Sequence, residues 1–129
     1  MLIDTSAWIE YLRDAHQGSA DAVDRLLRSG EGLTTSPVVM EVLAGARSPR
    51  HRDQLEGLLG GATLVRCEHE DFIEAALLYR LCRVNGETVR SMVDCLIAAV
   101  AVRTGTPVLH HDRDFDALAR HTPLVATSG

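Results

Sequence analysis

The sequence predicts an α/β protein whose parallel β-sheet is covered by helices on both faces. Short apolar runs alternate along the chain with longer segments whose apolar residues recur at helical spacing. Strands that alternate with helices favour parallel pairing, because each helix returns the chain to the same end of the sheet. The 129 residues contain no internal repeat, low-complexity segment or linker. We therefore expect residues 1–129 to form a single domain.

In the first half of the chain, Gly and Pro mark where the predicted elements begin and end. The helix after the first strand should carry Trp8, Ile9 and Leu12 toward the core. Gly30 suits the end of the second helix, and Pro37 suits the first turn of the third. The expected elements are a strand at 2–4, helices at 7–13 and 19–28, a strand at 32–37, and helices at 37–46 and 50–59.

The second half continues the alternation. The segment 91–103 is apolar almost all the way round, which is typical of a buried helix. The segment 70–84 is amphipathic and should lie at the surface. The expected elements are a strand at 62–67, helices at 70–84 and 91–103, a strand at 106–112, a short helix at 114–120 and an edge strand at 123–127.

Composition excludes several classes of protein. No apolar stretch reaches the roughly 18 residues that a membrane span needs, and no basic segment precedes an apolar one at the N-terminus. We therefore expect a cytoplasmic protein without a membrane partner. The net charge of −5 argues against a wide basic surface for non-specific nucleic-acid binding, so any contact with nucleic acid should be local.

Cysteine and histidine give no sign of a zinc site. Cys67, Cys82 and Cys95 form no CxxC pair and are odd in number, which disfavours a disulfide framework as well. We expect them to be buried thiols. His110 and His111 are adjacent at a strand end, where neighbouring side chains point to opposite faces, so they should not share a metal.

All 13 basic residues are arginine. They gather in "RSPRHR", residues 47–52, and in "RLCRVNGETVR", residues 80–90. Either group could meet a polyanion through planar, bidentate guanidinium contacts. The default interpretation of both groups is a solvated surface, with a codon bias toward arginine.

Four carboxylates stand where packing does not explain them. Asp4 and Asp112 follow apolar strands, at the carboxyl ends where open parallel sheets keep their binding crevice. Glu41 interrupts "VVMEVLAGA", and Asp94 interrupts "SMVDCLIAAVAV". Asp94 shares a helix face with residues that should be buried, and a buried charge needs a partner.

Each acid also has a purely structural interpretation. Asp4 can cap the first helix, and Asp112 can serve as a turn or cap residue before the last helix. Ser91 and Asp94 fit the capping-box spacing, which would place Asp94 in a first helical turn. Glu41 has no basic residue four positions on, where Gly45 stands, and small residues beside it leave room for a ligand.

If the four acids converge, they require cations. Oxygen-only ligands favour Mg²⁺ or Mn²⁺ over zinc or copper. One or two such ions, about 4 Å apart, would activate a water and stabilise the leaving oxygen in phosphodiester hydrolysis. Two bound divalent ions would bring the net charge from −5 to about −1, which reconciles an acidic protein with a nucleic-acid substrate.

The pattern resembles the PIN-domain ribonucleases, and specifically the VapC toxins of toxin–antitoxin pairs. The resemblance rests on "LIDTSAW", Glu41 in "VVMEVLAGA", Asp94 in "TVRSMVDCLIAAVAVRTG" and Asp112 in "VLHHDRDFDALAR", in that order over almost the whole chain. It implies a three-layer α/β/α sandwich with a central parallel sheet and metal-dependent endonucleolytic cleavage of RNA. It also implies a VapB-type antitoxin whose C-terminal segment wraps the toxin, and a homodimer within the toxin–antitoxin complex.

The resemblance assigns roles residue by residue. Asp4, Glu41, Asp94 and Asp112 would be the catalytic and Mg²⁺- or Mn²⁺-binding acids. Asp114 would be an accessory acid, and Thr5 or Ser6 would orient Asp4 or a water on the metal. His110 departs from the family, since many members have threonine two residues before the last acid, and this affects the geometry around the site.

Two arginines lie next to proposed ligands in the sequence. Arg90 is one turn before Asp94, and Arg113 is beside Asp112. We predict that both contact the RNA backbone near the site. Ordinary salt bridging is the alternative for both.

Two other functions fit part of the pattern. A haloacid-dehalogenase-type phosphatase also begins with an acid after a strand, but its second aspartate would fall at position 6, which is Ser6 here. A catalytically inert protein-binding module on the PIN fold would have no need of the complete acidic set. A nuclease assay with and without Mg²⁺ separates the three possibilities.

Overall fold

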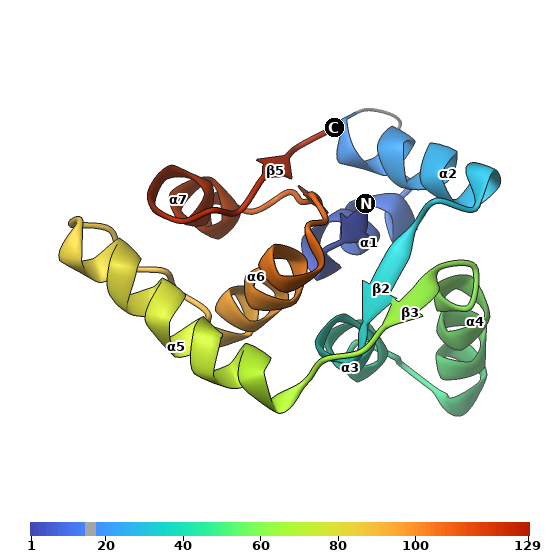
Figure 1. The fold of residues 1–129 in the computed structure, drawn as a ribbon. Helices are drawn as coiled ribbons and strands as arrows, with labels where there is room; N and C mark the ends of the chain where they lie inside the picture. The colour runs from blue at the N-terminus through green and yellow to red at the C-terminus, as the bar shows by residue number, and fades with distance from the viewer. Residues whose placement is uncertain (15–17) are drawn as a thin grey trace.

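The computed structural model describes residues 1–14 and 18–129 and contains a five-stranded sheet in which all paired strands are parallel. Helices follow the strands and pack on the sheet (Figure 1). The strands are β1 (Leu2–Ile3), β2 (Leu33–Thr35), β3 (Thr63–Val65), β4 (Val108–Leu109) and β5 (Ala126–Thr127). The helices are α1 (Thr5–Leu12), α2 (Ser19–Ser29), α3 (Ser36–Ala44), α4 (Pro49–Leu59), α5 (His69–Val84), α6 (Met92–Thr104) and α7 (Arg113–His121).

The order of the strands reverses at the centre of the sheet. The order is β3-β2-β1-β4-β5. The chain therefore adds β2 and β3 on one side of β1, crosses back over the sheet, and adds β4 and β5 on the other side of β1. The register pairs Leu2 with Val108 and Ile3 with Leu109. In open α/β sheets, ligands bind at the carboxyl ends of the two strands where the order reverses. Here those strands are β1 and β4.

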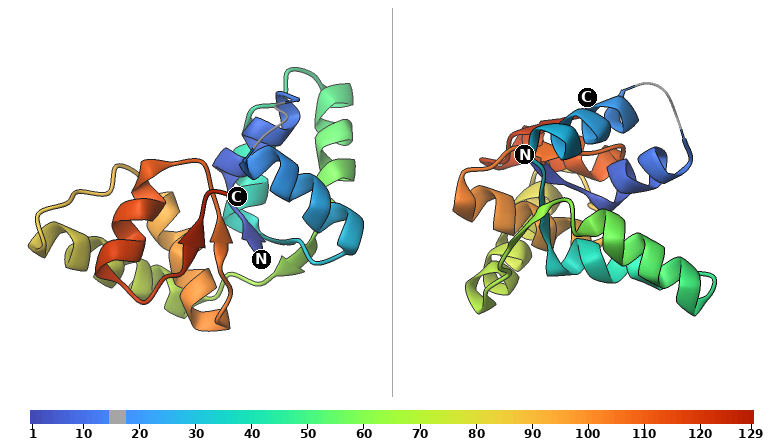
Figure 2. Two further views of the ribbon diagram at one scale, coloured as in Figure 1. Left: turned by 90° about the horizontal axis from the view of Figure 1, so that it is seen from above. Right: turned by 90° about the vertical axis from the view of Figure 1, so that its right-hand side faces the viewer.

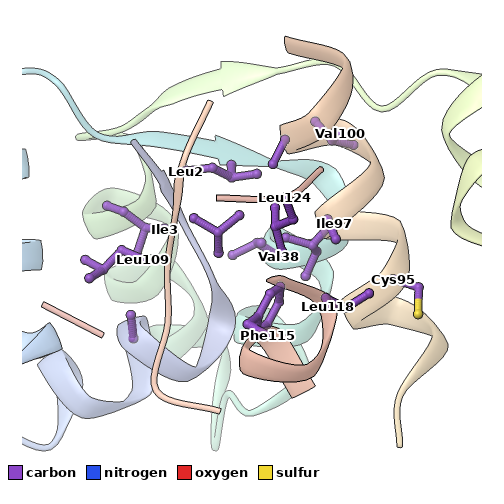
Figure 3. Close-up of a cluster of buried hydrophobic side chains, with 14 of the residues drawn as sticks. Leu2, Ile3, Val38, Cys95, Ile97, Val100, Leu109, Phe115, Leu118 and Leu124 are labelled. Carbon is purple, nitrogen blue, oxygen red and sulfur yellow. The ribbon is translucent and has the colours of Figure 1, made fainter. Parts of the chain in front are cut away.

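The helices form layers on the two sides of the sheet. Helices α5, α6 and α7 lie together on one side of the central strands, and α1 and α2 lie on the other, with α4 beside α3 (Figures 1 and 2). The predicted three-layer α/β/α class is therefore confirmed. Figure 3 shows the core between the sheet and α6 and α7, including Leu2, Ile3, Leu109, Ile97, Val100, Phe115 and Leu118.

All the predicted strands and helices are present, and their ends differ in a consistent way. Every strand is shorter than predicted, and several helices begin earlier. Asp4 is the N-cap of α1 rather than the end of a strand, and Pro37 lies within the first turn of α3, which begins at Ser36. Residues that look like strand ends in the sequence are therefore helix starts, because polar caps and proline favour the first turn.

Two predictions about buried residues are wrong. Ile9 and Leu12 are 40% and 39% exposed, whereas Trp8 is fully buried. The buried face of α1 is formed by Ala7 and Trp8; Ile9 lies on the helix flank, and Leu12 is the last residue of the helix. Cys67 is only half-buried because it follows the edge strand β3, while Cys82 and Cys95 are buried free thiols as predicted.

No helix in the described ranges is long and apolar enough to span a membrane.

Trp8 and Ile9, which are neighbours in α1, provide a test of which face of this helix is buried. Trp8→Ala should lower the free energy of unfolding by about 3–5 kcal/mol, because it leaves a large cavity in the core. Ile9→Ala, on the exposed flank, should lower it by less than about 1 kcal/mol. Urea unfolding of both variants measures the difference. Equal losses in the two variants would mean that α1 buries a different face.

Candidate functional site

The end of β1 holds Asp4 in two roles. As the N-cap of α1, its Oδ2 accepts a hydrogen bond from the Ser6 N–H at 2.9 Å and another from the Ser6 hydroxyl. Its own N–H donates to the Leu109 carbonyl at 2.9 Å, which ties it to the end of β4. Its second oxygen, Oδ1, is buried and has no hydrogen-bond partner among the described residues. Asp4 is therefore both a helix cap and a buried carboxylate with one oxygen available to a ligand.

Ser6 and Thr5 orient different acids. The Ser6 hydroxyl donates to Asp4 and accepts the His111 N–H at 2.8 Å, so it links the ends of β1 and β4. The Thr5 hydroxyl donates to Glu41 Oε1 at 2.7 Å. Of the two residues proposed to orient Asp4, Ser6 contacts it, whereas Thr5 positions Glu41. Consecutive residues at the start of α1 face different neighbours.

The acids form two adjoining groups. Oxygens of Asp4, Glu41 and Asp94 lie within 4.8 Å of one another, and so do oxygens of Asp94, Asp112 and Asp114. Asp94 belongs to both groups. All four acids singled out in the sequence, together with Asp114, therefore meet beyond the carboxyl ends of β1 and β4. They reach it from two strand ends and from the helices α3, α6 and α7.

The capping box expected as an alternative for Asp94 is not formed. Ser91 is the N-cap of α6, but no side-chain hydrogen bond caps this helix. The Ser91 N–H donates instead to Asp114 Oδ2, at 3.2 Å, and the Arg90 N–H donates to both oxygens of Asp114, at 3.2 Å. Asp114, from the next helix, thus takes the place of the capping-box acid. Asp94 is free to turn its carboxyl group toward the other acids.

Asp112 is a helix cap, as its structural interpretation predicts. It is the N-cap of α7, and its Oδ1 accepts the Asp114 N–H at 2.9 Å. The same oxygen accepts a hydrogen bond from Arg90 Nη2 at 2.8 Å. Capping does not remove Asp112 from the acidic cluster, because the cap position follows the end of β4 by only three residues.

Burial and mutual repulsion hold protons on the cluster. Burial, opposed by hydrogen bonds from Ser6, raises the pKa of Asp4 to about 6. Burial raises the pKa of Asp94 to about 9, and a hydrogen bond to Asp114 and the charges of Asp4 and Asp112 add to this. Burial alone would raise the pKa of Asp114, but hydrogen bonds from Asp94 and Arg90 bring it below its usual value. The cluster therefore favours a proton or a cation at Asp94.

The donor set fits a hard divalent cation. Every ligand atom in the two groups is a carboxylate oxygen, which suits Mg²⁺ or Mn²⁺. The unpartnered Oδ1 of Asp4 is an independent sign of a missing ligand, because a buried polar atom without a partner is costly.

The two histidines lie in different environments, as predicted. His110 is buried, and burial lowers its pKa; its Nδ1 accepts the Asp112 N–H at 3.2 Å, and its ring packs on Phe115 at 5.4 Å between centroids. His111 is exposed. His110 thus orients the backbone of Asp112.

The two arginines predicted to contact RNA differ sharply. Arg90 forms ion pairs with Asp112 at 2.8 Å and with Asp114 at 3.2 Å, so the salt-bridge alternative describes its state here. Arg113 is exposed and makes no ion pair with any residue that the structure describes. The sequence did not suggest that Arg90 would clamp the two acids. The one feature of the sequence that could have suggested this clamp is the position of Arg90, next to Ser91 and four residues before Asp94.

Comparisons with known proteins agree with this arrangement. Residues 1–121 match the family model described as "PIN domain". The chain belongs to the PIN-domain family. Its sequence is 44% identical to ribonuclease VapC11 of Mycobacterium tuberculosis over 131 aligned residues, which cover 99% of this chain and 98% of the relative. Ribonuclease VapC51 of the same organism is 31% identical, with 94% and 86% covered. This PIN domain is thus a member of the VapC group.

Solved structures share the fold of this PIN domain. A DNA-bound VapBC from Salmonella typhimurium superposes with a TM-score of 0.77 at 18% identity, covering 97% of this chain and 94% of the other. VapBC-5 from Mycobacterium tuberculosis, described as a member of a family of toxin–antitoxin systems, gives a TM-score of 0.68 at 23% identity, with 99% and 97% covered.

The protonation of Asp94 predicts how the stability of this PIN domain depends on pH. An unfolded Asp titrates near pH 4, and the folded group titrates at about 9. In chelator the folded state therefore retains a proton that the unfolded state has lost, so stability should fall as pH rises through this window. Asp94→Asn cannot ionise and should flatten most of that decline.

Urea unfolding in chelator at several pH values from about 5 to 9 measures this dependence. Asp21→Asn, at an exposed position in α2, is the matched control and should keep the wild-type slope. A wild-type slope retained by Asp94→Asn would mean that Asp94 is ionised in the folded protein.

Proposed function

We propose that this protein is an Mg²⁺- or Mn²⁺-dependent endoribonuclease and the toxin of a VapBC-type toxin–antitoxin pair. The observation that carries the proposal is the convergence of Asp4, Glu41, Asp94 and Asp112 beyond the carboxyl ends of β1 and β4. Close relatives named as ribonucleases, matching over nearly the whole chain, support the same activity. We place the activity in the cytoplasm, where RNA substrates are found.

Each residue has a role in this proposal. Asp4, Glu41 and Asp94 hold the divalent ion, with Asp112 completing the acidic set. When bound, the ion supplies Lewis acidity for attack by water on a phosphodiester bond. Ser6 and Thr5 fix the directions of the Asp4 and Glu41 carboxylates through hydrogen bonds. Asp114 positions Asp94 by anchoring the start of α6.

Contact with RNA is assigned to the arginines beside the acids. Arg113 is exposed next to Asp112 and free of ion pairs within the described ranges, so its guanidinium group can meet a backbone phosphate. Arg90 could do so only after leaving its two carboxylates.

The alternatives explain less of the site. At position 6, where a haloacid-dehalogenase-type phosphatase has its second aspartate, Ser6 stands with its hydroxyl committed to Asp4. An inert binding module would gain nothing from burying Asp4 and Asp94 together, since carboxylates that repel one another destabilise a fold.

The acid at the centre of the cluster gives the sharpest test. Asp94→Asn should lower Mg²⁺-dependent RNA cleavage by roughly a hundredfold or more, because it removes a ligand charge shared by both groups of acids. In chelator, near neutral pH, its unfolding midpoint should equal or exceed that of the wild type, because the wild type must keep a proton on Asp94 to avoid repulsion among the acids, and the variant has no such requirement.

Cleavage and unfolding should be measured on the same preparation, with Asp21→Asn as the control that keeps both properties. An Asp94→Asn variant that is active but less stable would contradict the catalytic assignment, since that is the behaviour of a helix-capping acid.

A groove beside the acids supports the antitoxin partner. A cavity of about 290 Å³ adjoins Glu41, and its lining combines apolar and basic residues: Ile9, Leu12, Val42 and Leu55 with Arg13, Arg47 and His51. The exposure of Ile9 and Leu12, unexpected from the sequence, gives an apolar surface that a partner segment could cover. Glu41, which lines the groove and belongs to the acidic cluster, would attract a basic side chain from that segment. We propose that a VapB-type antitoxin binds here.

Helix α5 supports the homodimer. Ile73, Leu77 and Leu81 are exposed and follow one another at four-residue spacing on its outer face. The N-terminal half of α5 also carries the acidic residues Glu70 and Glu74, and its C-terminal half carries the basic residues Arg80 and Arg83. Two antiparallel copies of α5 would therefore bring apolar residues together and place acidic residues of each copy beside basic residues of the other, as a two-fold interface requires.

A charge at the centre of this stripe should separate the dimer. Leu77→Glu should be monomeric at concentrations where the wild type is dimeric, because it buries an unpaired carboxylate in the interface. Leu64→Glu, on the edge strand β3, changes an equally apolar exposed residue outside α5 and should remain dimeric. Sedimentation velocity gives both masses, and a dimeric Leu77→Glu would rule out this interface.

A further inference from the structure

The two groups of acids differ in whether a positive charge is already present. In the group formed by Asp4, Glu41 and Asp94, the Oδ1 of Asp4 is buried without a partner, and no arginine side chain in the described ranges pairs with any of the three acids. Asp4 is only 2% exposed. This unpartnered oxygen, rather than the number of acids, indicates that the first group can bind a cation.

The second group, formed by Asp94, Asp112 and Asp114, already holds a cation. Arg90 Nη2 donates to Asp112 Oδ1 at 2.8 Å, and Arg90 Nε donates to Asp114 Oδ1 at 3.2 Å. One guanidinium group therefore bridges the two acids that face Asp94 from α7. Each of the contacted oxygens also accepts a backbone N–H, so neither is left unsatisfied.

We propose that Arg90 is the resident counter-cation of the second group and competes there with a divalent ion. The first ion binds at Asp4, Glu41 and Asp94. A second ion binds at Asp94, Asp112 and Asp114 only when the Arg90 side chain leaves. Arg90 thus makes the two positions unequal, and the inference rests on the metal site of the proposed function.

The surroundings of Arg90 allow it to leave without disturbing the fold. Its side chain is 59% exposed, so the released guanidinium group would be solvated at once. Asp114 would stay in place, because the backbone N–H groups of Arg90 and Ser91 still donate to it. The start of α6, and with it Asp94, is therefore held by the main chain, while the side chain of Arg90 serves only the charge of the two acids.

Calorimetric titration with Mn²⁺, in the absence of RNA, tests the proposal. The wild type should bind one ion tightly and a second ion weakly. Arg90→Gln should tighten the second binding step relative to the first by roughly fivefold, the scale of a partly exposed ion pair. Arg113→Gln removes a neighbouring positive charge that has no ion pair in the described structure, and it should leave the ratio of the two dissociation constants unchanged.

A second measurement follows Arg90 itself. In the NMR spectrum of the full chain, the Nε–H signal of Arg90 should persist when the first equivalent of Mg²⁺ binds and change when the second binds. Arg90→Lys, which keeps the charge without the bridging geometry, should tighten the second step less than Arg90→Gln does.

Equal ratios of dissociation constants in Arg90→Gln and Arg113→Gln would overturn the proposal, as would an Nε–H signal that changes with the first ion. Binding of only one ion by Arg90→Gln would overturn it too. None of these outcomes depends on RNA cleavage. A protein that binds two ions as described but cuts no RNA would refute the proposed function and leave the role of Arg90 intact.

Discussion

Repulsion among buried carboxyl groups is the constraint around which this protein is organised. Asp94 stands between two groups of acids, and burial together with its neighbours raises its pKa to about 9. Such a cluster would open the fold unless each acid were compensated. The compensation is local and different in each case. Ser6 and Thr5 hold Asp4 and Glu41 by hydrogen bonds, and Arg90 neutralises the acids from α7.

The sheet topology gives this cluster its place. Chain segments far apart in the sequence meet because β1 and β4 pair at the point where the strand order reverses. The helices that follow β1 and β4 each begin at an acid, and the bond from the His111 N–H to the Ser6 hydroxyl joins their starting points. The pairing of the strands and the hydrogen bonds of the main chain thus bring these positions together, whatever side chains they carry.

The sequence predicted the order and type of the elements because their hydrophobic periods are clear. It singled out the four acids that the structure brings together because a carboxylate inside or just after an apolar run is conspicuous. It did not predict strand ends, since a polar cap and a polar strand end look the same in the sequence. It also missed the clamp that Arg90 forms on Asp112 and Asp114. That contact joins α7 to the loop before α6, and periodicity carries no information about such pairing between distant segments.

The double role of Asp4 and Asp112 links the site to local motion of the chain. Each of these acids is the N-cap of a helix, so the first turns of α1 and α7 are held by carboxylates that also belong to the acidic cluster. Fraying of either helix start would displace a carboxylate oxygen of the acidic cluster, and a cation bound by that cluster would in turn suppress fraying. Backbone amide exchange at Ser6 and Asp114 would therefore report the occupancy of the site from within the main chain.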